Sequence, residues 1–166
     1  MATHAGKHAG AIVPVSFEPE YIAGLKKFYE ELIVFNQVLG LKLVSVTHDT
    51  VVGHIAMRPD LVGHFGYHRL HGGVISAVLD TTAGLAVLAA GGARHMDEPP
   101  AQRLQRFAKL GTIDLRVDYL RPGISEHFEA RAQVIRLGSR VASTRMEFTD
   151  AQGKLVSTGS AVYIVS

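Results

Sequence analysis

The 166-residue chain contains no cysteine and no tryptophan. The absence of cysteine excludes a disulfide framework, a thiolate zinc site and a cysteine nucleophile. Charged residues are also scarce, at 19% of the chain, and the formal net charge is only +2. So weak a basic balance argues against a nucleic-acid-binding protein, although it is compatible with a small anionic ligand.

The first fifteen residues lack the apolar core of a secretory signal and contain His4, Lys7 and His8 among alanines and glycines. We expect residues 1–15 to form a flexible tail and residues 16–166 to form one domain, because a chain of this length favours a single domain. We therefore expect a cytoplasmic protein.

The longest apolar run covers residues 70–93, with the sequence LHGGVISAVLDTTAGLAVLAAGGA. A helix over this run would be apolar on all sides, so we expect it to be buried in the core. Its length approaches that of a membrane span, but Asp80, Gly84 and two threonines interrupt it. We therefore expect no membrane association.

Asp80 is the only ionisable residue between positions 74 and 93. A buried carboxylate costs several kcal/mol unless it is paired, hydrogen-bonded, protonated or open to a wet cleft, so Asp80 is the first candidate for a functional residue. In the alternative interpretation, the hydroxyl of Thr81 or Thr82 satisfies a purely structural aspartate.

Before the apolar run, residues 17–39 predict one amphipathic helix that ends at Gly40. Its apolar side chains recur at three- and four-residue steps: Tyr21, Leu25, Phe28 and Leu32. Two strands are predicted within residues 41–57, followed by a loop over residues 61–70.

After the central helix, residues 91–109 form a polar excursion with a short helical piece near residues 102–107. Alternating apolar residues then predict four strands, over residues 112–120, 128–137, 141–149 and 155–165. Consecutive strands with short connections favour an antiparallel sheet. The chain therefore predicts an α+β fold in which a curved sheet wraps around the long central helix.

Leu70-His71-Gly72-Gly73, with Asp80 nine positions after the histidine, resembles the hotdog-fold acyl-CoA thioesterases of the PaaI type. The resemblance covers about residues 39–165 and includes VDYLRP at residues 117–122 and GKLV at residues 153–156. It implies the hotdog fold and hydrolysis of an acyl-CoA to a free acid and CoA. Asp80 would then be the general base or the nucleophile, and the Gly72 backbone N–H would polarise the thioester carbonyl. Coenzyme A would be part of the substrate, and no separate cofactor is expected.

One departure from the family concerns His64. Many members carry an asparagine shortly before the His-Gly-Gly motif, and it contacts the substrate carbonyl; His64 is the nearest match here. An imidazole can also donate a hydrogen bond, so we expect His64 to take this role. The alternative is an exposed loop residue. A zinc site from His64, His68 and His71 has no recognisable ligand pattern, so we expect no metal.

Further substrate-binding residues are expected at the helix start, near Asp80 and on the strands. His71 and Gly73 belong to the motif, and Gly84, one turn after Asp80, leaves room for an acyl group. Arg121 and Arg140 are our candidates for the CoA phosphates. For each of these residues the alternative to substrate binding is a purely structural role: packing for the residues of the helix, and a solvated surface position for the arginines. Other arginines considered for the phosphates are Arg103, Arg106, Arg116 and Arg136.

The spacing of Gly72 and Asp80 constrains the assembly. On one helix, eight residues correspond to about 12 Å, which is too far for both to touch one thioester. If both act in one site, they come from different copies of the chain. We therefore predict a homodimer, or a tetramer made of two dimers, with two equivalent sites at the subunit interface.

Two other functions compete with the thioesterase. His64-Phe65-Gly66 faintly resembles the His-Phe motif of hotdog acyl-thioester dehydratases, although the Pro-Gly that follows in that motif is missing. A non-catalytic acyl-CoA-binding protein is the second alternative, but pure binding gives no reason to bury Asp80. The small apolar residues around the helix favour medium or long aliphatic acyl chains.

Overall fold

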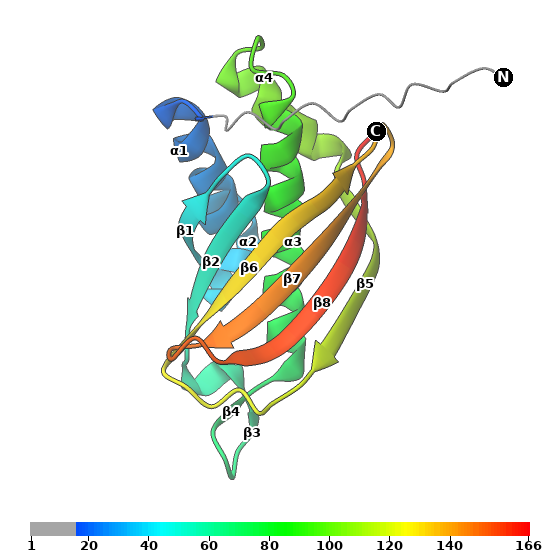
Figure 1. Cartoon of the computed structure of the whole chain (residues 1–166). Helices are drawn as coiled ribbons and strands as arrows, with labels where there is room; N and C mark the ends of the chain where they lie inside the picture. Colours follow the sequence, from blue (N-terminus) through cyan, green and yellow to red (C-terminus); the bar gives the residue numbers. More distant parts are fainter. Residues whose placement is uncertain (1–15) are drawn as a thin grey trace, which may run out of the picture.

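The computed structural model describes residues 16–166, apart from the side chain of Phe107. The predicted tail, residues 1–15, lies outside the described residues. A sheet of six antiparallel strands, in the order β1-β2-β6-β7-β8-β5, curves around the long helix α3 (Gly72–Ala93), as Figure 1 shows. The strands are β1 (Lys42–Val46), β2 (Thr50–Ala56), β5 (Gly111–Tyr119), β6 (His127–Leu137), β7 (Val141–Asp150) and β8 (Leu155–Ile164). The predicted α+β hotdog architecture is therefore confirmed.

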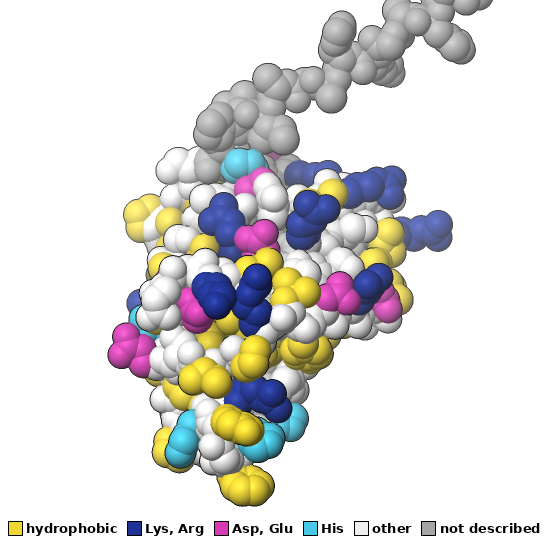
Figure 2. All heavy atoms as spheres, turned by 60° about the horizontal axis from the view of Figure 1, so that its bottom comes forward, with side chains coloured by type: hydrophobic (Ala, Val, Ile, Leu, Met, Phe, Trp, Pro, Cys, Tyr) yellow, Lys and Arg dark blue, Asp and Glu magenta, His cyan; other side chains and the backbone are white. Residues whose placement is uncertain are grey.

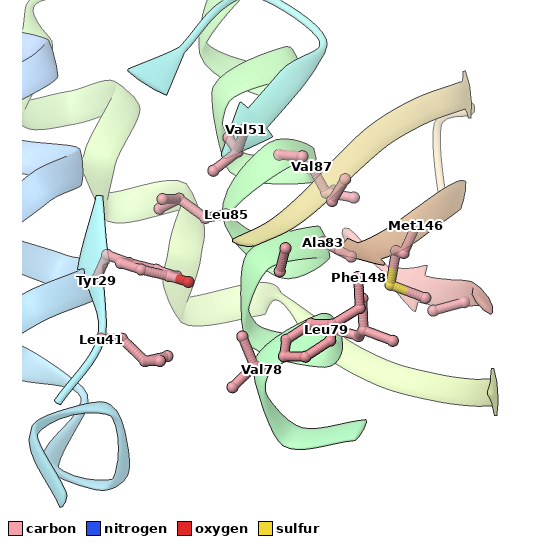
Figure 3. Packing of buried hydrophobic residues seen from close by; sticks show 14 of the residues in the cluster. Tyr29, Leu41, Val51, Val78, Leu79, Ala83, Leu85, Val87, Met146 and Phe148 are labelled. Atoms are coloured by element: carbon pink, nitrogen blue, oxygen red, sulfur yellow. The ribbon is translucent and has the colours of Figure 1, made fainter. Parts of the chain in front are cut away.

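The core lies between the concave face of the sheet and α3. Leu79 and Ala83 of α3 are buried in one cluster with Met146 and Phe148 of β7 (Figure 3). Alternate residues of β7 face this core, because successive side chains of a strand point to opposite faces. Burying one large aliphatic side chain contributes about 1.5–3 kcal/mol, so this interface is a main source of stability.

Helix α3 is long and apolar enough to cross a membrane, by length and composition alone. However, 67% of its most apolar window is buried inside the protein, as is typical of the core helix of a folded domain. The prediction that α3 is buried on all sides is correct for its second half only. Near its start Gly73 is exposed, and Asp80 and Thr81 are only partly buried.

The prediction of one continuous helix over residues 17–39 is wrong. The segment forms α1 (Pro19–Lys27), the π-helical turn η1 (Phe28–Leu32) and α2 (Val34–Leu39). A π-turn contains more residues than an α-turn, so the buried face shifts along the sequence. Tyr29 is fully buried, whereas Leu32 is 52% exposed. Gly40 ends α2 in the left-handed conformation, as predicted, with a φ of 72°.

The segment before α3, which the sequence predicted as a loop, contains regular secondary structure. A short turn, η2 (Pro59–Leu61), precedes a hairpin of β3 (Val62–His64) and β4 (Arg69–Leu70). After α3, the predicted short helix exists as α4 (Pro100–Gln105), and η3 (Arg106–Lys109) follows it. The four predicted strands after α3 are confirmed to within two residues at each end.

Arg103 is fully buried, which corrects its assignment as a candidate for the CoA phosphates. Its Nη2 lies 2.5 Å from Oε2 of Glu18, and its guanidinium lies 4.3 Å from the ring centre of Tyr21. Burial raises the pKa of Tyr21 to about 12. Arg103 therefore attaches α4 to α1 and is not accessible to a ligand.

Candidate active site

The carboxylate of Asp80 is held by hydroxyl groups from two strands. Its Oδ1 accepts hydrogen bonds from Oγ1 of Thr112 on β5, at 2.9 Å, and from the hydroxyl of Tyr163 on β8, also at 2.9 Å. The alternative that Thr81 or Thr82 satisfies Asp80 is wrong. Thr82 donates to the carbonyl of Val78 one turn earlier, and Oγ1 of Thr81 accepts from a different side chain.

Tyr163 is only 2% exposed. Burial raises the pKa of its phenol well above the usual range, and the nearby charge of Asp80 raises it further. The phenol therefore stays protonated at every physiological pH and remains a hydrogen-bond donor. Both donors contact Oδ1. The second carboxylate oxygen, Oδ2, accepts no hydrogen bond from any described residue. The two hydroxyl groups thus fix the orientation of the Asp80 carboxylate and leave Oδ2 free to take part in a reaction.

Asp80 opens onto a cavity of about 250 Å³, which we call the Asp80 cavity. Gly84 lines it, and a Cβ placed there would meet Leu110 at 3.6 Å, an ordinary contact. The cavity is mostly apolar, so it suits a hydrocarbon group beside a carboxylate. Its other lining residues are Ile33, Phe35, Asn36, Ala77, Thr81, Leu85, Leu110, Gly111, Thr112 and Tyr163.

The start of α3 is capped by the side chain of His71. Its Nδ1 accepts a hydrogen bond from the backbone N–H of Gly73 at 2.8 Å, so that N–H is already used. The backbone N–H of Gly72 donates to no described residue, so this first N–H of a helix is free to donate to a ligand. The hydroxyl of Tyr119 donates to the Gly72 carbonyl at 2.9 Å.

Gly72 and Asp80 open onto different cavities of one chain. Gly72 lines a cavity of about 420 Å³ that also contacts Arg69 and Arg121, which we call the Gly72 cavity. Asp80 is not among its lining residues. Within a single chain, therefore, the two predicted catalytic groups are not brought together.

The two arginines predicted to bind CoA phosphates lie at opposite ends of α3. Arg121 lines the Gly72 cavity, and its Nη1 donates to the carbonyl of Leu155 at 2.8 Å. Arg140 is exposed in the turn between β6 and β7, next to the far end of α3 (Figure 1). One site within one chain does not contain both.

His64 lies on β3 and is partly buried, so the alternative of a freely exposed loop residue does not describe it. Its ring packs against those of Phe65 and Tyr67, with centroid distances of 5.6 and 4.9 Å. Its Nδ1 is buried and has no hydrogen-bond partner among the described residues. Figure 2 shows histidine and hydrophobic side chains gathered at this end of the molecule. Over residues 16–166, no three histidine, aspartate or glutamate side chains converge as metal ligands would.

Three residues of the site were not predicted from the sequence: Thr112, Tyr119 and Tyr163. Thr112 and Tyr163 lie 32 and 83 positions from Asp80, so no local motif connects them to it. The only signal is a buried tyrosine near the end of β8. A buried tyrosine hydroxyl needs a partner, and this requirement could have indicated a polar group of α3 nearby.

Comparisons with known proteins identify the family of the chain. The family model described as "Thioesterase superfamily" matches residues 67–157. The medium/long-chain acyl-CoA thioesterase YigI of Escherichia coli K12 is 37% identical over 131 residues, covering 79% of this chain and 84% of YigI.

Two solved structures show the same fold. A protein of Shewanella oneidensis related to the thioesterase superfamily superposes with a TM-score of 0.82 at 37% identity, covering 90% of this chain and all of that one. The PaaI protein of the phenylacetic acid degradation operon of E. coli superposes with a TM-score of 0.70, covering 89% of this chain and 94% of PaaI. At 19% identity, PaaI supports the fold alone. The resemblance stated from the sequence is confirmed: the chain belongs to the thioesterase superfamily and is a thioester-hydrolysing enzyme.

Proposed function

We propose that this protein hydrolyses medium- or long-chain acyl-CoA, releasing a fatty acid and CoA. Asp80 carries the proposal, because it lines a mostly apolar cavity, and Thr112 and Tyr163 hold one of its carboxylate oxygens and leave the other without a described partner. Membership of the superfamily supports the reaction type. The 37% identity to a relative named as a medium/long-chain acyl-CoA thioesterase supports the substrate.

The free oxygen of Asp80 acts in one of two ways. As a general base, it takes a proton from water, and the hydroxide attacks the thioester carbonyl; the C–S bond then breaks and the CoA thiolate is protonated. As a nucleophile, the carboxylate itself attacks, CoA leaves, and water hydrolyses the resulting mixed anhydride. In both routes the backbone N–H of Gly72, at the positive end of α3, stabilises the oxyanion.

The active unit in this proposal is a homodimer, or a tetramer of two dimers, in which Asp80 of each subunit acts with Gly72 of its partner. Two observations support shared sites. The two residues open onto different cavities of one chain, and they are eight residues apart on one straight helix, about 12 Å. A two-fold axis that pairs two α3 helices in antiparallel orientation would form two equivalent sites.

The remaining predicted residues take supporting roles in this proposal. Gly84 and the apolar lining of the Asp80 cavity hold the acyl chain. His71 and Gly73 shape the start of α3, and their mutual hydrogen bond favours positioning over direct contact with substrate. Arg121, beside Gly72, attracts the CoA phosphates. The cytoplasmic location and the roles of Arg140 and His64 stay predictions.

Release of free thiol from a panel of acyl-CoA substrates tests the proposal. We expect turnover of C8 to C16 substrates, and a loss of at least about 100-fold in the Asp80→Asn variant, as for removal of a general base. Asp114→Asn is the matched control, because Asp114 is exposed on β5 and has no contact with the site. Substrate hydration without thiol release would indicate a dehydratase. Tight acyl-CoA binding without turnover would indicate a binding protein.

A further inference from the structure

A larger cavity lies at the far end of α3 from Gly72. Its volume is about 560 Å³, within the usual range of small-molecule sites, and we call it the distal cavity. It lies between the last turns of α3, the segment from α4 to η3, the turn between β6 and β7, and the end of β8. Its lining residues are Val87, Leu88, Gly91, Arg94, His95, Gln102, Gln105, Arg106, Ala108, Lys109, Leu110, Leu137, Gly138, Ser139, Val165 and Ser166.

Gly91 keeps the distal cavity open. A Cβ built on Gly91 would meet no atom within 4 Å, so packing does not require a glycine there. Its neighbour Gly92 differs, because a Cβ there would lie 2.0 Å from the hydroxyl of Tyr21. Alanine is more favourable than glycine inside a helix. The glycine at position 91 therefore has a cost to helix stability and leaves space that a side chain would fill.

The rim of the distal cavity carries cationic side chains, and one of them has no partner among the described residues. Arg106 forms an ion pair with Glu98, and Arg94 donates to the carbonyl of Leu137. The ammonium of Lys109 forms no ion pair or hydrogen bond with any described residue. An anionic group in the cavity would therefore meet a cation that is not already neutralised.

The walls of the distal cavity determine which anion fits. Every apolar residue that lines it is aliphatic, including Val87, Leu88 and Leu137, so it offers an alkyl chain apolar contact along α3. The described lining contains no phenylalanine, tyrosine or tryptophan on which a nucleotide base would stack, and the imidazole Nδ1 of its one histidine, His95, lies 3.5 Å from Oε1 of Glu98. We propose that the distal cavity binds a fatty carboxylate, with its alkyl chain against α3 and its carboxylate at Lys109.

Leu110 lines both the distal cavity and the Asp80 cavity, so the two cavities share one wall residue. A fatty acid is also the product that the proposed reaction releases. The source of the ligand therefore rests on the proposed function, whereas the capacity to bind it does not.

Calorimetric titration of the full-length protein with decanoate tests the proposal. Two leucine variants separate the cavities: Gly91→Leu fills the distal cavity, and Gly84→Leu fills the Asp80 cavity. We expect Gly91→Leu to weaken decanoate binding more than tenfold and Gly84→Leu to leave a site of wild-type affinity. Lys109→Gln should weaken binding about tenfold, the weight of one charge-assisted hydrogen bond. Lys154→Gln, at an exposed lysine remote from the cavity, should not.

The proposal is overturned if decanoate does not bind, if Gly91→Leu and Lys109→Gln bind it as tightly as the wild type, or if Gly84→Leu alone abolishes binding. It is also overturned if decanol binds as tightly as decanoate, because the anion would then have no role. Circular dichroism checks each fold, and Lys109→Gln with the decanol comparison decides if Gly91→Leu does not fold. A wild type that binds decanoate at Lys109 but releases no thiol would refute the proposed function alone.

Discussion

The hydroxyl of Tyr163 lies 2.8 Å from the backbone carbonyl oxygen of Asp80 and 2.9 Å from its Oδ1. One phenol therefore connects β8, the last strand along the chain, to both the main chain and the side chain of the proposed catalytic residue. Because the phenol is buried and its pKa is raised, it holds the carboxylate in one orientation across the physiological pH range.

Replacing Tyr163 by phenylalanine should lower kcat about 10- to 100-fold and change KM less than about twofold. The variant loses one hydrogen bond to a charged group, which is worth about 1.5–3 kcal/mol, but keeps the shape of the ring. Steady-state kinetics with one good acyl-CoA measure both constants.

Tyr29→Phe is the matched control for this prediction. Tyr29 is equally buried and shares a 2.7 Å hydrogen bond with Oγ1 of Thr82, but it has no contact with Asp80. Its loss should lower the free energy of unfolding by about 1 kcal/mol and leave kcat unchanged. Equal losses of kcat in the two variants would mean that Tyr163 acts only through stability.

Replacing His64 by alanine should reduce kcat/KM about tenfold, which is less than the Asp80→Asn change. The loss is partial because the backbone N–H of Gly72 still polarises the carbonyl. His68→Asn on the same hairpin is the control, since asparagine tolerates the positive φ of 45° at that position. Wild-type kinetics in His64→Ala would assign this histidine to the packing of Phe65 and Tyr67.

Mixing two inactive variants tests whether the sites are shared. One variant carries Asp80→Asn and the other Gly72→Leu, which blocks the approach of substrate. In a mixed dimer with shared sites, both lesions fall in one site and the other site is wild type. Activity should therefore return to about half per mixed dimer. If proven subunit exchange restores none, each site belongs to one chain.

Alkaline pH should destabilise the protein through its buried tyrosines. Burial raises the pKa of Tyr21 to about 12 and raises those of Tyr29 and Tyr163 further. Between pH 10 and 12 these phenols stay protonated in the folded chain but ionise in the unfolded chain, so the folded state binds more protons. Each one then lowers the free energy of unfolding by up to about 1.4 kcal/mol per pH unit.

Absorbance of the phenolate and circular dichroism, followed together from pH 9 to 13, measure this effect. The phenolate signal of the three buried tyrosines should appear only as the fold is lost. Their ionisation in a chain that retains its native circular dichroism would contradict the burial of these rings.

Local patterns predicted most of the fold. Alternation in the strands after α3 reports directly which face meets the core, so their bounds were predicted to within two residues. The π-turn at residues 28–32 was missed because its cause is tertiary: Tyr29 reaches Thr82 of α3, and that contact selects which side chain faces inwards. Arg103 was assigned to the surface because its partner, Glu18, lies 85 positions away.

In the candidate site, too, some residues could be predicted from local sequence patterns and others depend on tertiary contacts. Asp80 and Gly72 are visible in the sequence because a carboxylate and a glycine pair stand out in an apolar run. Thr112 and Tyr163 do not stand out, since a threonine and a tyrosine are common in strands. Only the register of β5 and β8 against α3 brings their hydroxyls to the carboxylate, and no sequence pattern contains that register.

Helix α3 fixes the distances between the three cavities, because each of them is lined by a residue of this helix. Gly72, Asp80 and Gly91 mark them along one uninterrupted rod, at separations of about 12 Å and 16 Å for a rise of 1.5 Å per residue. A packed helix does not stretch, so mutation can deepen or block a cavity but cannot change its distance from the next. Related chains with the same helix would therefore differ in acyl-chain preference through the bulk of side chains such as Leu110, while the spacing of the reacting groups stays constant.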